Sequence, residues 1–207
     1  MTINTHSDNF IAHAINTFCS YRSIIIFDYD STIARLPIDW AIARTNYRNY
    51  IARYLPSITF KDGLRLDEME SRALTENPEK FKLIYSFRNK IENQATYNHE
   101  PVIDTVNYLK IKSTRQYYII SNNLHSTVIA GLSQLGLLSR FAKVIGIDDV
   151  QSPKPSLKSL SLLGRTANDI KNKSLFIGDS DLTDGRFCLK AKIPFINIVN
   201  KTIHINA

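Results

Sequence analysis

Five short runs of apolar residues, rich in isoleucine and aromatic side chains, alternate along the chain with segments of helical periodicity. Polar or turn residues bound each run, which is typical of strands buried inside a sheet. The predicted strands are Ser23–Phe27, Gln116–Ile120, Lys143–Ile147, Ser174–Ile177 and Phe195–Val199. Because these runs are apolar throughout, we expect a parallel sheet covered by helices on both faces, an α/β fold of the doubly wound, Rossmann-like kind.

Helical patterns lie between most of the predicted strands, and one more precedes the first strand. The predicted helices are Phe10–Tyr21, Pro101–Ile111, Thr127–Leu137, Pro155–Leu163 and Leu182–Ala191. In the second of them Val102, Val106 and Leu109 recur at helical spacing, and the proline suits a first helical turn. This alternation of strand and helix supports the parallel sheet.

The chain between the first two predicted strands is much longer than one crossover requires. From about Ile33 to His99 it contains no comparable strand and has the pattern of three or four amphipathic helices. We therefore predict a small helical cap formed by residues 36–99. It would be inserted into an α/β core made of residues 1–35 and 100–207.

Composition places few further limits on the function. The 207 residues are 43% hydrophobic and 22% charged, as expected for one globular domain with a modest insertion. The 26 lysines and arginines exceed the 19 acidic residues, for a net charge of +7, but they form no polybasic run. We therefore expect a basic surface that handles small anions, and no nucleic-acid partner.

Cysteine, histidine and the terminal sequence suggest no other class of site. Cys19 and Cys188 form no CxxC pair, so we expect two packed small hydrophobes, and the five histidines lack metal-ligand spacing. The first residues do not have the pattern of a signal peptide, and no window approaches the roughly 20 apolar residues of a membrane span. We expect a cytoplasmic protein without a membrane partner, whose oligomeric state the sequence does not determine.

Polar residues follow three of the predicted strands at the point where each strand ends. Asp28 and Asp30 follow the first strand, Ser121–Asn123 the second, and Gly178–Ser180 the fourth, with Asp184 shortly after. Lys154 lies between two prolines in SPKPS. Ligands bind beyond the carboxyl ends of strands in open parallel sheets, so these side chains are expected to meet in one site.

These residues form four motifs in a fixed order: DYDST, a strand-end serine at Ser121, a loop lysine at Lys154, and GDSDLTD. In this order they resemble the haloacid dehalogenase-like (HAD) superfamily of hydrolases. The helical insertion after the first motif, together with the segments IDW and SNN, resembles its helical-cap, phosphoglycolate phosphatase-like branch. The resemblance implies a phosphatase, dependent on Mg²⁺, that hydrolyses a small phosphorylated metabolite.

The residue types suit phosphoryl transfer, which needs a nucleophile, charge neutralisation and positioning. Asp28 can attack phosphorus and form an aspartyl phosphate. Asp30 can protonate the leaving oxygen and then deprotonate the attacking water. Dehalogenation is disfavoured because that reaction does not need the acid–base residue Asp30.

Two ionised carboxylates facing a phosphate would repel it, and Mg²⁺ would remove this repulsion. The resemblance implies that Asp28, the backbone carbonyl of Asp30 and Asp179 bind the metal. Asp184 would lie behind these ligands and orient a water or Lys154.

The resemblance also assigns the phosphate-binding groups. Ser121, the backbone N–H of Asn122 and Lys154 would bind the phosphate oxygens away from the metal. Tyr29 stands where the family more often has an aliphatic residue or phenylalanine, and its hydroxyl is expected to point toward the cap.

Cap residues would determine the substrate. Arg44 and Arg48 lie four residues apart, so they share a helix face and could bind a substrate carboxylate or second phosphate. The ordinary alternative is a solvated basic face, and the sequence favours it. Trp40 and Tyr47 are expected in the core of the cap.

Two alternatives to a phosphatase remain open. A phosphomutase could use the same residues, and it would show slow net hydrolysis and depend on a bisphosphate activator. A non-catalytic binding or regulatory module is disfavoured because it would not need both Asp28 and Asp30.

Overall fold

A computed structural model describes residues 10–18 and 20–204, and its centre is a six-stranded sheet of order β5-β4-β1-β6-β7-β8. The first five strands in this order are parallel, and only β8 is antiparallel to its neighbour. The strands are β1 (Ile24–Phe27), β4 (Gln116–Ile120), β5 (Phe141–Ile145), β6 (Ser174–Gly178), β7 (Phe195–Asn197) and β8 (Thr202–His204). The predicted doubly wound α/β fold is confirmed.

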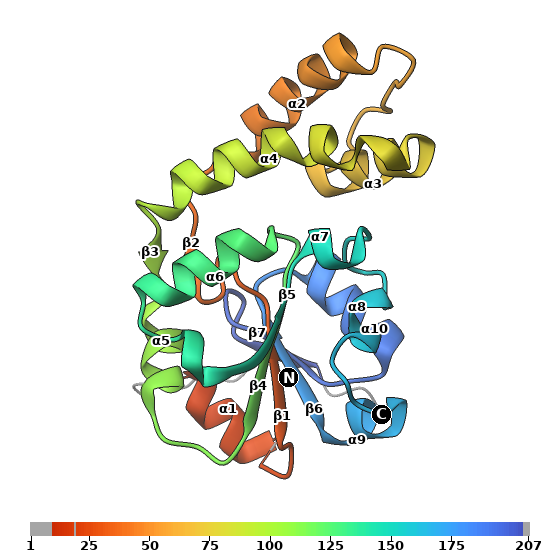
Figure 1. The fold of residues 1–207 in the computed structure, drawn as a ribbon. Helices are drawn as coiled ribbons and strands as arrows, with labels where there is room; N and C mark the ends of the chain where they lie inside the picture. Colours follow the sequence, from red (N-terminus) through yellow and green to blue (C-terminus); the bar gives the residue numbers. More distant parts are fainter. Residues whose placement is uncertain (1–9, 19, 205–207) are drawn as a thin grey trace.

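Helices cover both faces of this sheet (Figure 1). Side chains that alternate along β1 separate the two layers, since Ile25 and Phe27 belong to one apolar cluster and Ile24 and Ile26 to the other. The first cluster includes residues of α1 (Phe10–Phe18), α5 (Ile103–Lys110) and α6 (His125–Gln134). The second includes residues of α9 (Ala167–Lys173) and α10 (Arg186–Ala191), with α8 (Lys158–Ser161) packed against it.

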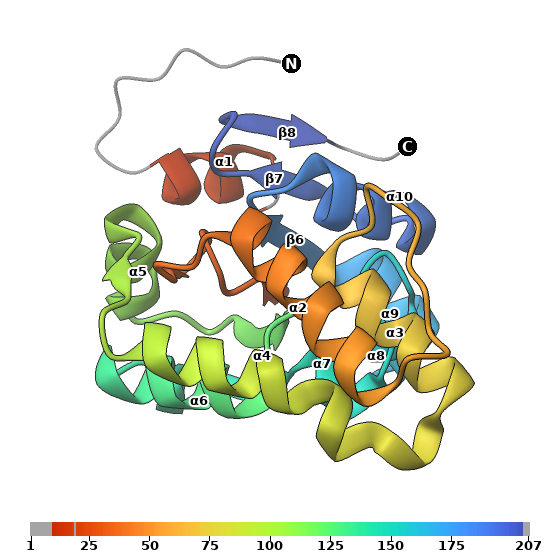
Figure 2. The same ribbon diagram turned by 90° about the horizontal axis from the view of Figure 1, so that it is seen from above.

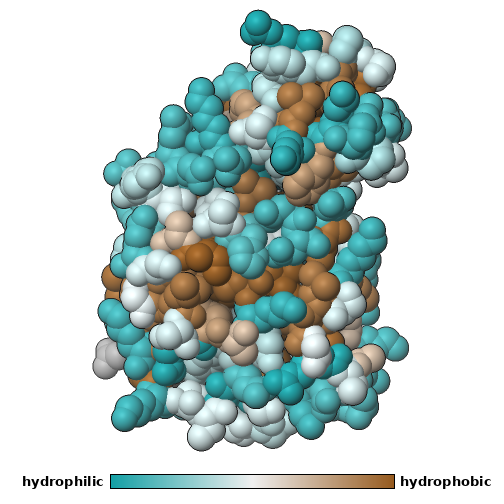
Figure 3. All heavy atoms as spheres, in the orientation of Figure 1, coloured by the Kyte–Doolittle hydropathy of each residue, from teal (hydrophilic) through white to brown (hydrophobic). Residues whose placement is uncertain are grey.

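The edge of the sheet at β5 is less well covered than its centre. Figure 3 shows the molecule from the same side as Figure 1. Apolar side chains gather across the middle of the surface seen there, with hydrophilic side chains above and below them. Phe141, at the start of β5, is only partly buried and packs against the first cluster. The central strand β1 is buried along its whole length.

Register places the ends of the three central strands at one level. Phe27, the last residue of β1, lies opposite Ile119 of β4 and Ile177 of β6. The residues that follow therefore emerge together at one edge of the sheet, as expected for a doubly wound fold.

A separate group of helices lies above that edge (Figure 1). It comprises α2 (Trp40–Tyr54), α3 (Leu66–Glu76), the short 3₁₀ helix η1 (Pro78–Lys80) and α4 (Phe81–Thr96). These helices share an apolar cluster that includes Tyr47, Met69 and Ile84. Leu124 and Ile147, which lie on the sheet side of the chain, also belong to this cluster. Seen from above, α4 runs alongside α6 (Figure 2).

The two chain connections to this group pair with each other. β2 (Ala34–Arg35) and β3 (Glu100–Pro101) form an antiparallel ribbon, with Arg35 opposite Glu100. We infer that residues 36–99 form an inserted cap, because they begin and end at this ribbon and have an apolar cluster largely of their own.

Several predicted boundaries were wrong. The strand predicted at Lys143–Ile147 lies at Phe141–Ile145, because the Asp149 carboxylate accepts the N–H of Gly146 and begins helix α7 (Ile147–Val150) there. The helix predicted from Leu182 is a π-helical turn, Asp181–Gly185, followed by α10. The N-terminal helix ends at Phe18 and not at Tyr21. The last predicted strand ends at Asn197, and the sequence analysis missed α7, α9 and β8.

The prediction for Tyr29 was also wrong. Its side chain is fully buried in the core and does not point toward the cap. A Cβ built at Gly131 of α6 would lie 2.7 Å from Cζ of the tyrosine ring. The missing side chain at Gly131 therefore makes the space that the tyrosine occupies.

The remaining structural expectations concern cysteine and the membrane. Cys188 is buried in α10, as expected, whereas Cys19 and residues 1–9 lie outside the described residues. Among the described residues, no helix has the length and apolar character that crossing a bilayer requires.

Candidate active site

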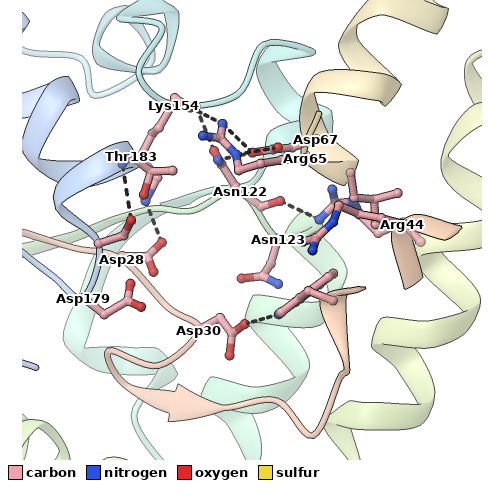
Figure 4. Close-up of a pocket in the computed structure, with 14 residues that line it drawn as sticks. Asp28, Asp30, Arg44, Arg65, Asp67, Asn122, Asn123, Lys154, Asp179 and Thr183 are labelled. Carbon is pink, nitrogen blue, oxygen red and sulfur yellow. Dashed lines mark hydrogen bonds and ion pairs between the residues drawn. The ribbon is translucent and has the colours of Figure 1, made fainter. Parts of the chain in front are cut away.

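A cavity of about 270 Å³ lies between the carboxyl edge of the sheet and the helices above it. Residues from both sides line it, and Figure 4 draws them. They are Asp28, Asp30, Trp40, Arg44, Arg65, Leu66, Asp67, Arg88, Asn122, Asn123, Lys154, Asp179, Ser180 and Thr183. The cavity thus brings together most of the site residues predicted from the four motifs.

The strand β1 positions Asp28 directly. The N–H of Asp28 donates to the carbonyl of Ile177 at 2.9 Å, which continues the pairing of β1 with β6 by one residue. Asp28 is 7% exposed, so it is held at the floor of the cavity. After Asp28 the chain turns away through Ser31, whose φ of 60° lies in the left-handed region that favours glycine.

Lys154 is buried between two carboxylates. Its Nζ lies 2.6 Å from Oδ1 of Asp28 and 2.6 Å from Oδ1 of Asp184 (Figure 4 shows the first contact). Burial alone would lower the pKa of Lys154, but the charges of Asp184 and Asp28 raise it above its ordinary value. The lysine is therefore a permanent cation beside Asp28.

One lysine does not balance the acids around it. Oxygen atoms of Asp28, Asp179 and Asp184 all lie within 4.8 Å of one another. Burial, followed by repulsion from Asp28 and Asp184, raises the pKa of Asp179 to about 8. This part of the site therefore has surplus negative charge that a proton or a metal cation would neutralise.

Asp30 lies apart from these acids and is held by two donors. Its Oδ1 accepts the N–H of Leu36 at 2.9 Å, and its Oδ2 accepts the indole N–H of Trp40 at 3.2 Å. Burial raises the pKa of Asp30 to about 6, although both hydrogen bonds oppose that shift. Asp30 can therefore exchange a proton near neutral pH.

Trp40 was expected in the core of the cap, and it packs, partly buried, against the apolar cluster of the cap helices. Trp40 is the first residue of α2, and it lines the cavity. A sequence pattern shows that an aromatic residue is buried, but it does not show which surface buries it.

The predicted phosphate-binding residues lie on two loops that contact each other. The Oγ of Ser121 donates to Oδ1 of Asn123 at 2.9 Å, and Ser121 itself does not line the cavity. The side chain of Asn122 accepts the N–H of Lys154 at 2.8 Å and donates to Oδ2 of Asp67 at 2.6 Å. Asn122 thus connects the lysine loop with helix α3.

The structure separates the two arginines that were candidates for binding the substrate. Arg44 lines the cavity, whereas the guanidinium of Arg48 donates to the carbonyls of Phe60 at 2.9 Å and Lys61 at 2.6 Å. Arg48 therefore stabilises the loop between α2 and α3 and does not line the site.

Sequence analysis missed a buried network that joins the cap helices to the second motif. Arg88 of α4 pairs with Glu70 at 2.7 Å and Glu92 at 3.1 Å, and it donates to the carbonyl of Asn122 at 3.0 Å. Glu92 also accepts the N–H of Leu124 at 2.9 Å. Arg88 and Glu92 are four residues apart, a spacing that usually indicates a solvated ion pair, so the sequence does not signal their burial.

Arg65 makes a second connection across the cavity. It pairs with Asp67 at 3.0 Å and donates to the carbonyl of Lys154 at 3.2 Å. The loop that holds Lys154 is therefore in direct contact with the start of α3.

Comparison with known proteins agrees with these features. The family model described as haloacid dehalogenase-like hydrolase matches residues 25–198. The pyrophosphatase PpaX of Bacillus velezensis is 29% identical over 165 residues, which cover 75% of this chain and 74% of the relative.

Solved structures of other proteins are similar in fold, and two of them serve as examples. One, from Lactobacillus plantarum, is of a protein assigned as a phosphoglycolate phosphatase; it is 20% identical, with a TM-score of 0.59 over 87% of each chain. The other, a haloacid dehalogenase-like family protein of Streptococcus pneumoniae, is 17% identical, with a TM-score of 0.55 over 86% of this chain and 85% of that one.

Proposed function

The chain belongs to the haloacid dehalogenase-like hydrolases and hydrolyses phosphoric esters, and we propose that it is a Mg²⁺-dependent phosphatase of a small phosphorylated metabolite. The observation that carries the proposal is the position of Asp28. It lies at the end of the central strand, 2.6 Å from a buried lysine, and shares the cavity with the proton-exchanging Asp30.

In the first step Asp28 is the nucleophile. Its Oδ1 faces Lys154, so Oδ2 is the oxygen that attacks phosphorus. A bond from Asp28 to phosphorus forms while the bond from phosphorus to the leaving oxygen breaks. Asp30 donates its proton to that oxygen, which departs as an alcohol or as a protonated phosphate.

In the second step water releases the phosphate. Asp30, now ionised, takes a proton from the water as the water attacks phosphorus, and the bond to Asp28 breaks. The hydrogen bonds from Leu36 and Trp40 hold the Asp30 carboxylate in place throughout. Both aspartates return to their starting states.

The acids at the strand ends fit a magnesium ion. Asp28 and Asp179, with the backbone carbonyl of Asp30, would hold it, because Mg²⁺ prefers a few carboxylate and carbonyl oxygens with water. Asp184 would orient Lys154, to which it is already bound at 2.6 Å. When bound, the ion neutralises charge on the phosphate and on the acids.

The phosphate oxygens away from these acids would be held by Lys154 and by the loop of Ser121 and Asn122. Lys154 provides a fixed positive charge. Ser121 is positioned by Asn123, to which it is hydrogen-bonded. The helices α2–α4 would close the site from above and limit access of water.

The test is release of phosphate from pyrophosphate, phosphoglycolate, sugar phosphates, nucleotides and an aryl phosphate. We expect turnover of at least one compound with Mg²⁺, and loss of it with EDTA that added Mg²⁺ reverses. Undiminished turnover in EDTA would contradict the metal dependence. Slow release that a sugar bisphosphate accelerates would indicate a phosphomutase instead.

Gly178 provides a second prediction, because it makes room for Asp184. A Cβ at Gly178 would lie 2.7 Å from Cγ of Asp184, so Gly178→Ala should displace that carboxylate and the lysine bound to it. We expect phosphatase activity to fall by about 100-fold, as small misplacements in active sites do. The free energy of unfolding should fall by about 1–3 kcal/mol.

Gly185→Ala is the matched control, since its Cβ would meet Phe195 at 3.4 Å, an ordinary contact. Phosphate release and urea unfolding are measured for both variants. Full activity in Gly178→Ala would show that the position of Asp184 is unimportant.

A further inference from the structure

The charges of the cavity are mostly paired within the chain. Of its cationic residues, Lys154 contacts Asp28 and Asp184, as described above. Arg65 forms an ion pair with Asp67 at 3.0 Å. Arg88 is held by two buried glutamates. None of these three cations needs a ligand to neutralise it.

Arg44 differs from the other three. It lines the cavity and is half-buried, yet within residues 10–18 and 20–204 its guanidinium has no ion pair or hydrogen bond. Helix α2 has no acidic residue, so it offers Arg44 no partner. The other arginines of α2 are engaged elsewhere, Arg48 by backbone carbonyls and Arg53 over the ring of Tyr54.

The place of Arg44 suits the far end of a ligand. In Figure 4, Asp28 and Asp179 lie at one side of the cavity and Arg44 at the other. Apolar surface from Trp40 and Leu66 also lines the cavity. A guanidinium in such a site attracts an anion more strongly than one in open water, and its planar donors suit a carboxylate or a phosphate.

We propose that Arg44 binds a second anionic group of the substrate. This inference rests on the proposed phosphatase function and narrows it to compact phosphate esters or anhydrides that also bear a carboxylate or another phosphoryl group. The volume of about 270 Å³ is at the small end for ligand cavities, so the two anionic groups must be only a few bonds apart.

Binding can be measured without turnover. Trp40 is the only tryptophan of the chain and it lines the cavity, so its fluorescence reports occupancy. With Mg²⁺ in excess, the protein is titrated with propylphosphonate, 3-phosphonopropionate and methylenebisphosphonate, whose P–C bonds are not hydrolysed. The first has a neutral tail, the second a carboxylate and the third a second phosphonate.

We expect at least one of the two doubly anionic probes to bind at least about tenfold more tightly than propylphosphonate, the effect of one charged hydrogen-bonded contact. Whichever binds more tightly identifies the second group as a carboxylate or a phosphoryl group. Arg44→Gln should remove this advantage and leave the affinity for propylphosphonate within about twofold. Arg53→Gln changes an exposed residue of the same helix, and this variant should keep the tighter binding of the doubly anionic probe.

Equal affinities for all three probes, or an equal loss for all three in Arg44→Gln, would overturn the inference. These outcomes are separate from the test of the proposed function. Turnover of phosphate esters without a preference for the second anion would retain the phosphatase and reject the role of Arg44. The preference without any turnover would support the role of Arg44 and reject the phosphatase.

Discussion

Asp28→Asn is expected to lower the turnover number for phosphate release by at least about 1000-fold, because an amide cannot replace the attacking carboxylate. The protein should remain folded, since asparagine has the same shape and Lys154 keeps its contact with Asp184 at 2.6 Å. Removing one of three crowded carboxylates also relieves repulsion among them. Phosphate release and urea unfolding measure the two effects.

Asp62→Asn makes the same chemical change at a fully exposed position and should leave turnover unchanged. Mass spectrometry after acid quenching provides a second readout. The wild-type chain should carry a phosphoryl group during turnover, and the Asp28→Asn chain should not. Turnover of Asp28→Asn within tenfold of wild type would show that the nucleophile is another group.

Arg88→Met is expected to reduce the free energy of unfolding by about 3–5 kcal/mol, the usual cost of removing one partner from a buried ion pair. Arg88 is 3% exposed and its partners Glu70 and Glu92 are fully buried. Even with Arg88 nearby, burial raises the pKa of Glu70 to about 7. Without the arginine, two buried carboxylates would have no compensating charge.

This loss should depend on pH. In Arg88→Met the pKa of Glu70 rises further above its value in the unfolded chain, because the arginine that lowers it is gone, so the folded protein binds more protons than the unfolded one. The deficit relative to wild type should therefore shrink as the pH is lowered from about 8 to about 6. Urea unfolding of both proteins at both pH values measures this difference in the free energy of unfolding.

Arg72→Met removes a half-exposed arginine that is paired with Glu76 on the surface of α3. This control should change stability by less than about 0.5 kcal/mol at either pH. If Arg88→Met lost no more stability than Arg72→Met, a structural role for the buried network would be contradicted.

The parts of the site that follow strands could be predicted from the sequence. Asp28, Asn122 and Asp179 lie within two residues of the ends of apolar runs, and parallel strands bring such residues to one edge. The four motifs made the family recognisable, and the family comparison confirmed it. The central strand β4 was predicted to the residue, because its apolar run has clear polar boundaries.

The cap side of the site could not be predicted in the same way. Arg44 and Arg48 have the same spacing and residue type, and only the folded chain shows that one lines the cavity while the other holds a loop. Trp40 and Arg88 are similar cases, since the helix pattern does not tell whether a face packs within the cap or against the core. Short elements such as β8, three residues long, carry too little pattern to be recognised.

The position of β1 in the sheet has a consequence for how the chain is made. β1 is synthesised first among the strands of the main sheet, yet both of its neighbours come later, and Ile24 pairs with Gln116 and Ser174. Until β6 emerges from the ribosome, the run IIIF has no complete pairing, whereas helices α2–α4 form from one continuous stretch of chain. Pairings so distant in sequence slow folding, because long loops must close first. An incomplete chain therefore exposes an apolar strand, which favours aggregation during synthesis.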